Sequence, residues 1–120
     1  MEKSKFENLT VWQRAQKLAV QIYKETNSSI FVKDYSLRDQ IRRSAVSVPS
    51  NIAEGDERSS DAESVRFFFI AKGSLAELRT QVRIAHEIGY LIESKFNEID
   101  SECLELNKML WGLIKARKKD

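Results

Sequence analysis

The sequence predicts an all-α protein: one domain over residues 1–120, folded as an antiparallel four-helix bundle that runs up, down, up and down. Its 120 residues suit one domain and are too few for two ordinary ones. Four glycines and one proline are far fewer than the turns of a sandwich, barrel or disulfide scaffold need. Apolar residues make up 42% of the chain and recur every three or four positions, which is the period of an amphipathic helix.

The first predicted helix begins near Thr10 and ends before the polar run at 26–29. Thr10 and Gln13 fit the pattern in which two side chains satisfy free backbone groups at a helix start. In the loop that follows, we expect Phe31 and Tyr35 to serve as anchors. The apolar stripe of this helix consists of Val11, Trp12, Ala15, Leu18, Ala19, Ile22 and Tyr23.

The second predicted helix contains the proline. Ser36 is a suitable N-cap, and we expect Gly55 to end the helix as the residue just beyond its last turn. Pro49 removes a backbone donor and crowds the carbonyl of Ala45, so the helix either kinks there or ends and restarts. We predict a kink, because the apolar spacing continues in phase beyond the proline. Its stripe consists of Leu37, Ile41, Ala45, Val48 and Ile52, and the small residues Ser44, Ser47 and Ser50 would let another backbone approach.

The third predicted helix begins at a capping box, Ser60 with Glu63, and runs to about Ile88, with Gly89 as its terminator. A heptad series forms its main stripe: Phe68, Ala71, Leu75, Leu78, Val82 and Ala85. A second stripe consists of Ile70, Gly73, Ala76, Thr80, Ile84 and Ile88.

Two apolar sides on one helix predict self-association. Three consecutive phenylalanines, 67–69, cover about 200° of the helix surface, which is too wide for one core seam. In a monomer one of the two sides would face water, and a contiguous exposed apolar patch usually marks an interface. We predict an interface between copies of the chain that includes Phe67, Phe69, Gly73, Ala76 and Ile84.

The fourth predicted helix opens near Ser94 and ends in the basic run 115–119, whose cations complement the helix dipole. Its stripe consists of Ile99, Cys103, Leu106, Leu110 and Leu113, widened by Met109, Trp111 and Ile114.

The sequence holds no catalytic or metal-binding constellation, so we predict no enzyme, no cofactor and no metal site. His86 is the single histidine, and it points about 100° away from Glu87 on a helix, which makes the two poor co-ligands. We expect Cys103 to be a buried structural thiol, and a single cysteine suggests a reducing, cytoplasmic setting. The start of the chain is polar and no apolar run approaches 18 residues, so we expect neither a signal peptide nor a membrane span.

The net charge of +2 is not that of a dedicated nucleic-acid binder, so a basic surface would require local segregation of charge. Candidate phosphate contacts come in three clusters: Arg42 and Arg43; Arg79 and Arg83; and Lys115, Arg117, Lys118 and Lys119. The alternative is a solvated face with intrahelical pairs, such as Asp39 with Arg43 or Arg83 with Glu87. In a ring-shaped oligomer each cluster would be repeated around the axis, which would strengthen its field.

Four sequence runs resemble those of a known bacterial family, and the similarity extends over nearly the whole chain. The run 40–55, QIRRSAVSVPSNIAEG, resembles the signature of the four-helix bundle proteins encoded in intervening sequences of the 23S ribosomal RNA gene. Runs 9–15 (LTVWQRA), 70–78 (IAKGSLAEL) and 88–91 (IGYL) are similar to its opening, its third-helix motif and its third-helix terminator.

The resemblance implies an antiparallel four-helix bundle, assembly as a pentameric ring and no established enzymatic activity. A related branch comprises accessory proteins of diversity-generating retroelements, which bind a reverse transcriptase and nucleic acid through basic surfaces. This chain departs from that branch in its near-neutral charge. Two hypotheses follow: a homo-oligomeric bundle that binds RNA or DNA weakly, and a scaffold that binds another protein.

Overall fold

The computed structural model describes residues 6–118, and within that range it contains helices and no strand. A short 3-10 helix, η1 (Phe6–Asn8), precedes α1 (Thr10–Glu25) and the one-turn α2 (Ser29–Lys33). Three long helices follow: α3 (Tyr35–Asp56), α4 (Asp61–Glu87) and α5 (Glu93–Lys118). The predicted all-helical fold with four long helices is confirmed.

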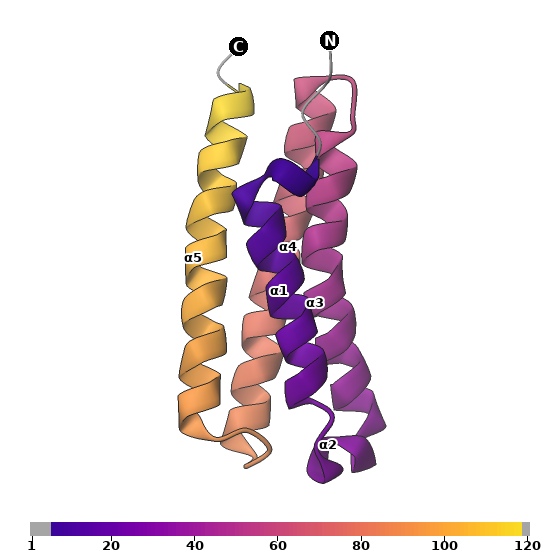
Figure 1. The fold of residues 1–120 in the computed structure, drawn as a ribbon, viewed down its shortest axis with the longest axis vertical. Helices are drawn as coiled ribbons and strands as arrows, with labels where there is room; N and C mark the ends of the chain where they lie inside the picture. The colour runs from indigo at the N-terminus through magenta and orange to yellow at the C-terminus, as the bar shows by residue number, and fades with distance from the viewer. Residues whose placement is uncertain (1–5, 119–120) are drawn as a thin grey trace.

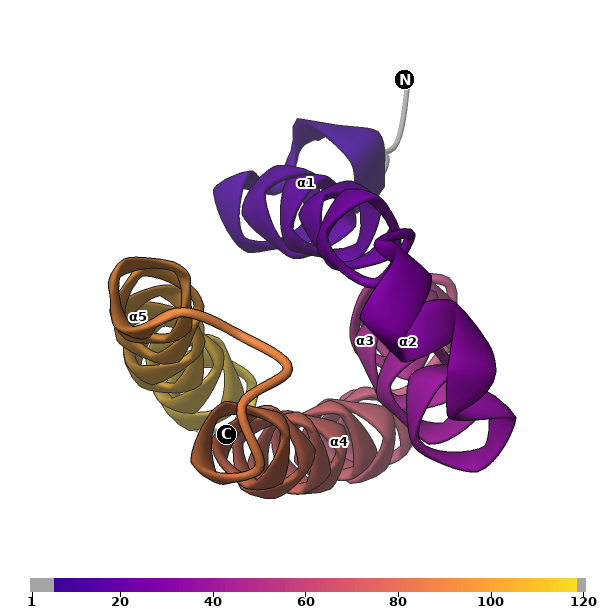
Figure 2. The same cartoon turned by 90° about the horizontal axis from the view of Figure 1, so that it is seen from below.

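The four long helices lie along the axis of an elongated molecule that measures 49 × 21 × 20 Å (Figure 1). The start of α1 and the end of α5 lie at one end of it, and α2 and the α4–α5 connection lie at the other. Seen along the bundle, the helices surround a common centre in the order α1, α3, α4, α5 (Figure 2). Among neighbouring long helices, contacts are most extensive between α3 and α4 and least extensive between α1 and α5.

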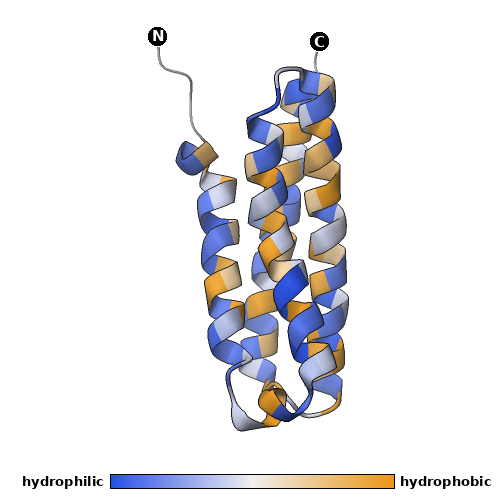
Figure 3. Cartoon of the chain, turned by 90° about the vertical axis from the view of Figure 1, so that its right-hand side faces the viewer, coloured by the Kyte–Doolittle hydropathy of each residue, from blue (hydrophilic) through white to orange (hydrophobic). Residues whose placement is uncertain are grey.

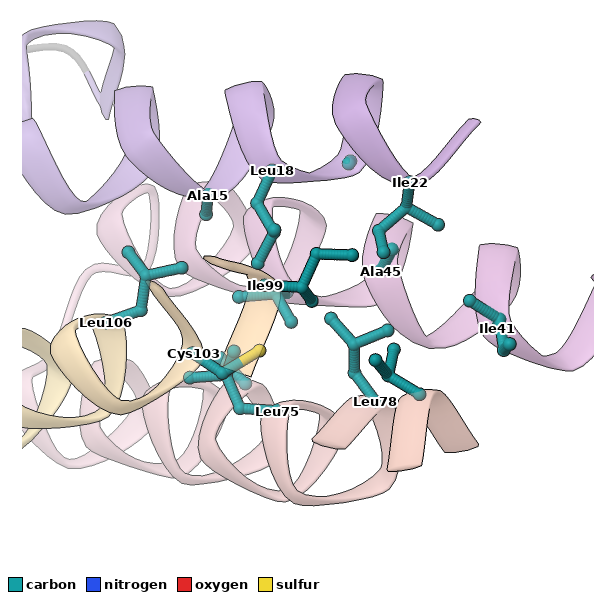
Figure 4. Close-up of a cluster of buried hydrophobic side chains, with 14 of the residues drawn as sticks. Ala15, Leu18, Ile22, Ile41, Ala45, Leu75, Leu78, Ile99, Cys103 and Leu106 are labelled. Atoms are coloured by element: carbon teal, nitrogen blue, oxygen red, sulfur yellow. The ribbon is translucent and has the colours of Figure 1, made fainter. Parts of the chain in front are cut away.

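The heptad stripes meet at this centre. Every residue of the main α4 stripe is buried, as are Ile41, Ala45, Val48 and Ile52 of α3. Figure 4 shows side chains from all four long helices converging, among them Leu18, Leu75 and Leu106. Each long helix also carries polar residues (Figure 3). The period of three and four residues therefore identified the core.

Helix α1 begins at Thr10, as predicted, but the predicted capping of α1 and of α3 is wrong. Leu9, not Thr10, occupies the N-cap of α1 and makes no side-chain cap bond, while Gln13 Nε2 donates to the carbonyl of Glu7 at 2.8 Å. Helix α3 begins at Tyr35, and its N-cap lies two residues before the predicted one, Ser36. Asp34 caps it by accepting from the backbone N–H of Leu37 at 3.2 Å. The helical turn α2 ends just before Asp34, so the backbone of Asp34 is not helical and its side chain can cap α3.

The segment predicted as a loop contains α2, and one of its two expected anchors is wrong. Phe31 is buried, but the Tyr35 side chain is 66% exposed. The second anchor is instead Tyr90, whose ring packs edge-on against Phe31 with 5.3 Å between ring centres. Its hydroxyl donates to Asp34 at 3.0 Å, and this bond raises the pKa of Tyr90.

Helix α3 continues through Pro49 as one helix, so the alternative in which it ends there is wrong. Gly55 does not terminate it, because the helix runs on to Asp56. Gly55 serves packing instead: a Cβ there would lie 2.7 Å from Cε1 of Phe68 and 3.1 Å from Cβ of Phe67. The Ser64 hydroxyl also donates to the Gly55 carbonyl at 2.6 Å, which ties α3 to α4.

The boundaries of α4 match the sequence well. Ser60 Oγ accepts from the backbone N–H of Glu63 at 3.2 Å. Gly89 has φ +86, the left-handed conformation that glycine adopts without strain. The N–H of Gly89 donates to His86 and that of Tyr90 to Ala85, which is a Schellman ending. Helix α5 begins at Glu93, one residue before Ser94.

Candidate interfaces on the bundle surface

The second stripe of α4 faces away from the core. All six of its residues are exposed in the single chain, from Ile70 to Ile88. A Cβ added at Gly73 would meet nothing within 4 Å. The stripe holds three of the residues predicted to form an interface between copies: Gly73, Ala76 and Ile84.

The two phenylalanines of the predicted interface lie differently. Phe69 is 42% exposed, and its ring packs edge-on against Trp111 of α5, which is equally exposed. The apolar surface therefore extends from α4 onto α5, where Leu104 is also exposed. Phe67 is half-buried, and the guanidinium of Arg58 lies 4.6 Å from its ring centre. Phe67 thus packs within the chain.

Arg42 and Arg43 are neighbours in sequence with different surroundings. Arg42 Nε donates to the Thr26 hydroxyl at 2.8 Å and Nη2 donates to the Tyr23 carbonyl at 3.3 Å, so Arg42 ties α3 to the end of α1. Arg43 is exposed on the outer side of α3. The predicted pair of Asp39 with Arg43 does not form, because Asp39 bonds to Arg38 at 3.1 Å.

Arg79 and Arg83 lie on the side of α4 that faces α5. Arg79 binds Asp100 through Nε at 2.8 Å and Nη2 at 3.3 Å, and these hydrogen bonds raise the pKa of Arg79. The guanidinium of Arg83 lies 5.2 Å from the ring centre of Phe96. Among the described residues, the ion pairs do not include the predicted pair of Arg83 with Glu87.

The C-terminal basic cluster covers the far end of α5. Arg117 binds Asp56 of α3 at 2.9 Å, and the Asp56 side chain is only 8% exposed. The ammonium groups of Lys115 and Lys118 lie 5.8 and 6.0 Å from the ring centres of Trp111 and Phe69. Lys119 lies outside the described residues. The fold therefore does not gather the three basic clusters into one surface.

Two open grooves meet on α3, and of their lining residues the sequence predicted Arg42 and Arg43 as binding residues. The first groove, of about 530 Å³, is lined by Tyr23, Asp39, Arg42, Arg43, Val46 and Ser47. The second groove, of about 430 Å³, is lined by Gln40, Arg43, Ser44, Ser47, Glu77 and Gln81. Tyr23 was assigned to the core stripe, but its side chain is 45% exposed. Tyr23 lies at the end of that stripe, next to polar residues, and this position could have indicated its exposure.

Most of the chain matches one known protein family. The model of the 23S rRNA-intervening sequence protein family matches residues 7–112. The chain belongs to this family. The match includes both grooves and the exposed stripe of α4, and it ends before the C-terminal cluster that begins at Lys115.

A solved structure shows the same fold. It is a protein of unknown function from the S23 ribosomal protein family of Bacteroides thetaiotaomicron, and it is 26% identical to this chain. The match covers 88% of this chain and 99% of that one, with a TM-score of 0.81. No curated protein matches the sequence.

Cys103 and His86 are the two side chains that the sequence offered as candidates for reactivity. Cys103 is buried, as predicted, and burial raises the pKa of its thiol to about 12, which disfavours the reactive thiolate. The His86 ring stacks on Phe96 with 4.7 Å between ring centres, and its Nδ1 lies 3.0 Å from the Leu91 carbonyl.

Within residues 6–118, His, Cys, Asp and Glu side chains form no group of three or more that could hold a metal ion. The helices in that range are also not long and apolar enough to cross a membrane.

Proposed function

We propose that this chain is a cytoplasmic, non-enzymatic bundle that assembles with copies of itself as a pentamer and binds RNA or DNA weakly through basic side chains. The pentamer is what the resemblance to the intervening-sequence proteins implies. The exposed stripe of α4 is the observation that supports assembly. It is a second apolar side on a helix whose first apolar side is fully buried.

The proposal includes an up-down-up-down order of helices with α3 kinked at Pro49. Four residues join α3 to α4 and five join α4 to α5, and connections this short suit antiparallel neighbours. Pro49 lacks the N–H that would bond to the carbonyl of Ala45, which is the usual cause of a kink.

The mass in solution tests assembly. Light scattering should give about five times the chain mass of 13.9 kDa. Gly73→Leu should lower that mass, because a bulky side chain then stands on the stripe where none stood before. A single-chain mass for the wild-type protein would overturn the proposal.

Gly112→Leu is the matched control. Both glycines are exposed within long helices, and a Cβ at either one meets nothing within 4 Å. Both substitutions replace glycine with a better helix former, so neither should impair folding. The control should leave the assembled mass unchanged, and an equal loss of mass in both variants would show that the α4 stripe is not the interface.

Salt dependence tests nucleic-acid binding. The supporting residues are Arg42, Arg43, Arg79 and Arg83, with the C-terminal cluster second. Because phosphate contacts release counterions, the affinity for a structured RNA should fall steeply between low and moderate salt. Affinity that ignores salt, or no binding at low salt, would contradict this part of the proposal.

One observation favours the second candidate, a protein-interaction scaffold. Arg79 and Arg117 already have carboxylate partners within the chain, Asp100 and Asp56. If the arginines serve structure, Arg79→Glu combined with Arg83→Glu should disturb assembly and leave nucleic-acid affinity unchanged. A fall in affinity with the mass unaltered would exclude the scaffold in favour of the first candidate.

A further inference from the structure

We propose that the first groove on α3, between Tyr23 and Ser47, binds single-stranded nucleic acid, with the Tyr23 ring stacking on a base and Arg43 contacting phosphate. This inference rests on the proposed nucleic-acid binding and assigns it to one site and one kind of strand. The groove is named the Tyr23 groove below.

Tyr23 has the features of a stacking platform. Its side chain is 45% exposed although it lies one residue after the buried Ile22. The guanidinium of Arg42 lies 4.4 Å from its ring centre and is held by two hydrogen bonds, to Thr26 and to the Tyr23 carbonyl. The ring is therefore held against a fixed cation. Aromatic rings presented in this way stack on bases of any sequence.

The charge of the Tyr23 groove is basic where a strand would enter. Arg43 takes part in none of the ion pairs that the described residues form. The acidic member of the lining, Asp39, is engaged by Arg38. Neither bond of Arg42 uses its Nη1 nitrogen, which remains able to donate. Two adjacent guanidinium groups thus offer donors to phosphate oxygens.

The path of the strand continues beyond the Tyr23 groove. The second groove shares Arg43 and Ser47 with it and reaches Gln81 of α4. Arg43 lies between the two grooves, as a phosphate contact between successive nucleotides would. The proposed contact with the strand is therefore confined to these two grooves. Binding of a duplex relies instead on charges spread along its backbone.

The preference for a single strand over a duplex follows from the stacking role proposed for Tyr23. A base in a duplex is already stacked on its neighbours and paired, so an aromatic side chain at the surface cannot reach its face. An unpaired strand offers that face freely. A groove with one aromatic ring and two adjacent arginines therefore suits a single strand better than a duplex.

Fluorescence anisotropy with a labelled oligothymidylate of about 12 nucleotides, and with the matching duplex, tests the inference at low salt. The wild-type protein should prefer the single strand about tenfold, and Tyr23→Ala should remove that preference. Tyr23→Leu keeps the apolar contact with Arg42 without an aromatic face, and it should behave in the same way. Arg43→Gln should weaken binding of both the single strand and the duplex, and Arg43→Lys should restore most of that binding.

Tyr35→Ala is the matched control for the aromatic ring. Tyr35 is also exposed and also carries an arginine, with the Arg38 guanidinium 5.4 Å from its ring centre, but it lines neither groove. Arg66→Gln, on the exposed side of α4, is the control for Arg43. Both controls should bind like the wild-type protein.

The outcomes separate this inference from the proposed function. Equal affinity for strand and duplex, with Tyr23→Ala unchanged and Arg43→Gln weakened, would overturn the single-strand site and leave nucleic-acid binding intact. Loss of affinity in Tyr35→Ala equal to that in Tyr23→Ala would likewise overturn the assignment. No binding of either oligonucleotide at low salt would overturn both.

Discussion

The α3/α4 seam and the α1/α5 seam hold the same bundle together by different means. Across the α3/α4 seam uncharged side chains bond to each other: Ser47 to Ser74 at 2.8 Å and Ser44 to Gln81 at 2.9 Å. Across the α1/α5 seam long side chains meet: Arg14 binds Glu102 through two nitrogens at 2.6 and 2.9 Å. Lys95 reaches Glu25 at 3.5 Å in the same seam.

The difference shows how side-chain size sets the spacing of helices. Serine and glycine let the α3 and α4 backbones approach, so neighbouring hydroxyls can bond directly and Phe68 can lie against Gly55. Arginine, lysine and glutamate can bridge a wider seam, but their ion pairs remain partly in water and contribute little. The α3/α4 seam should therefore tolerate no added volume, and the α1/α5 seam should tolerate loss of charge.

The largest expected effect is at Gly55. Gly55→Ala would place a Cβ 2.7 Å from the buried Phe68 ring, and overpacking of this kind costs about 1–3 kcal/mol of unfolding free energy. Urea denaturation measures it. Gly112→Ala, at an open position of α5, should instead leave stability unchanged or raise it by up to about 1 kcal/mol. If Gly55→Ala were as stable as the wild-type protein, close packing at this seam would not be what requires glycine.

The next effect is a loss of stability at alkaline pH from Cys103, which is buried on α5. The folded thiol has a pKa of about 12, whereas an exposed thiol ionises near 8.5. Above that pH the unfolded chain loses the proton and the folded chain keeps it, so unfolding becomes easier by about 1.4 kcal/mol per pH unit until about pH 12. The stabilisation is complete below the unfolded pKa.

The measurement compares wild-type and Cys103→Ala stability at neutral pH and near pH 10. Alanine costs stability at neutral pH because it leaves a cavity. The gap between the two proteins should narrow as the pH rises, since only the wild-type protein carries the thiol. A gap that stays constant with pH would contradict the burial of a protonated thiol.

The smallest effect is at the α1/α5 ion pair. Arg14 and Glu102 are 37% and 27% exposed, so Arg14→Ala should cost no more than about 1 kcal/mol, and less in high salt. Replacing both partners, as Arg14→Met with Glu102→Leu, should be close to neutral. A cost of several kcal/mol in Arg14→Ala would show that the α1/α5 seam contributes as much to stability as the α3/α4 seam.

Sequence periodicity identified the core because burial of a helix side depends on local spacing. The buried heptad from Phe68 to Ala85 followed from that spacing alone. The local ending at Gly89 was also predictable, because a left-handed residue there needs only its own neighbours. The N-cap of α3 was not predictable, because Ser36 and Asp34 are both residue types that cap helices well. Asp34 is the cap because the unexpected turn α2 ends just before it.

The basic residues show where sequence reasoning stops. It considers partners three or four positions away, so it predicted Arg83 with Glu87 and could not foresee Arg79 with Asp100 or Arg117 with Asp56. Gly55 was misread for the same reason, because Phe68 belongs to the next helix.

The α1/α5 seam joins the first and last long helices, and this gives the bundle an order of assembly. Arg14 and Glu102 are 88 positions apart, while Ser47 and Ser74 are 27 apart. Closing the longer loop costs about 1 kcal/mol more in chain entropy, and it gains weaker contacts in return. During synthesis α3 and α4 can pair before α5 has been made. We therefore expect α3 and α4 to pair early and α1 to dock against α5 last.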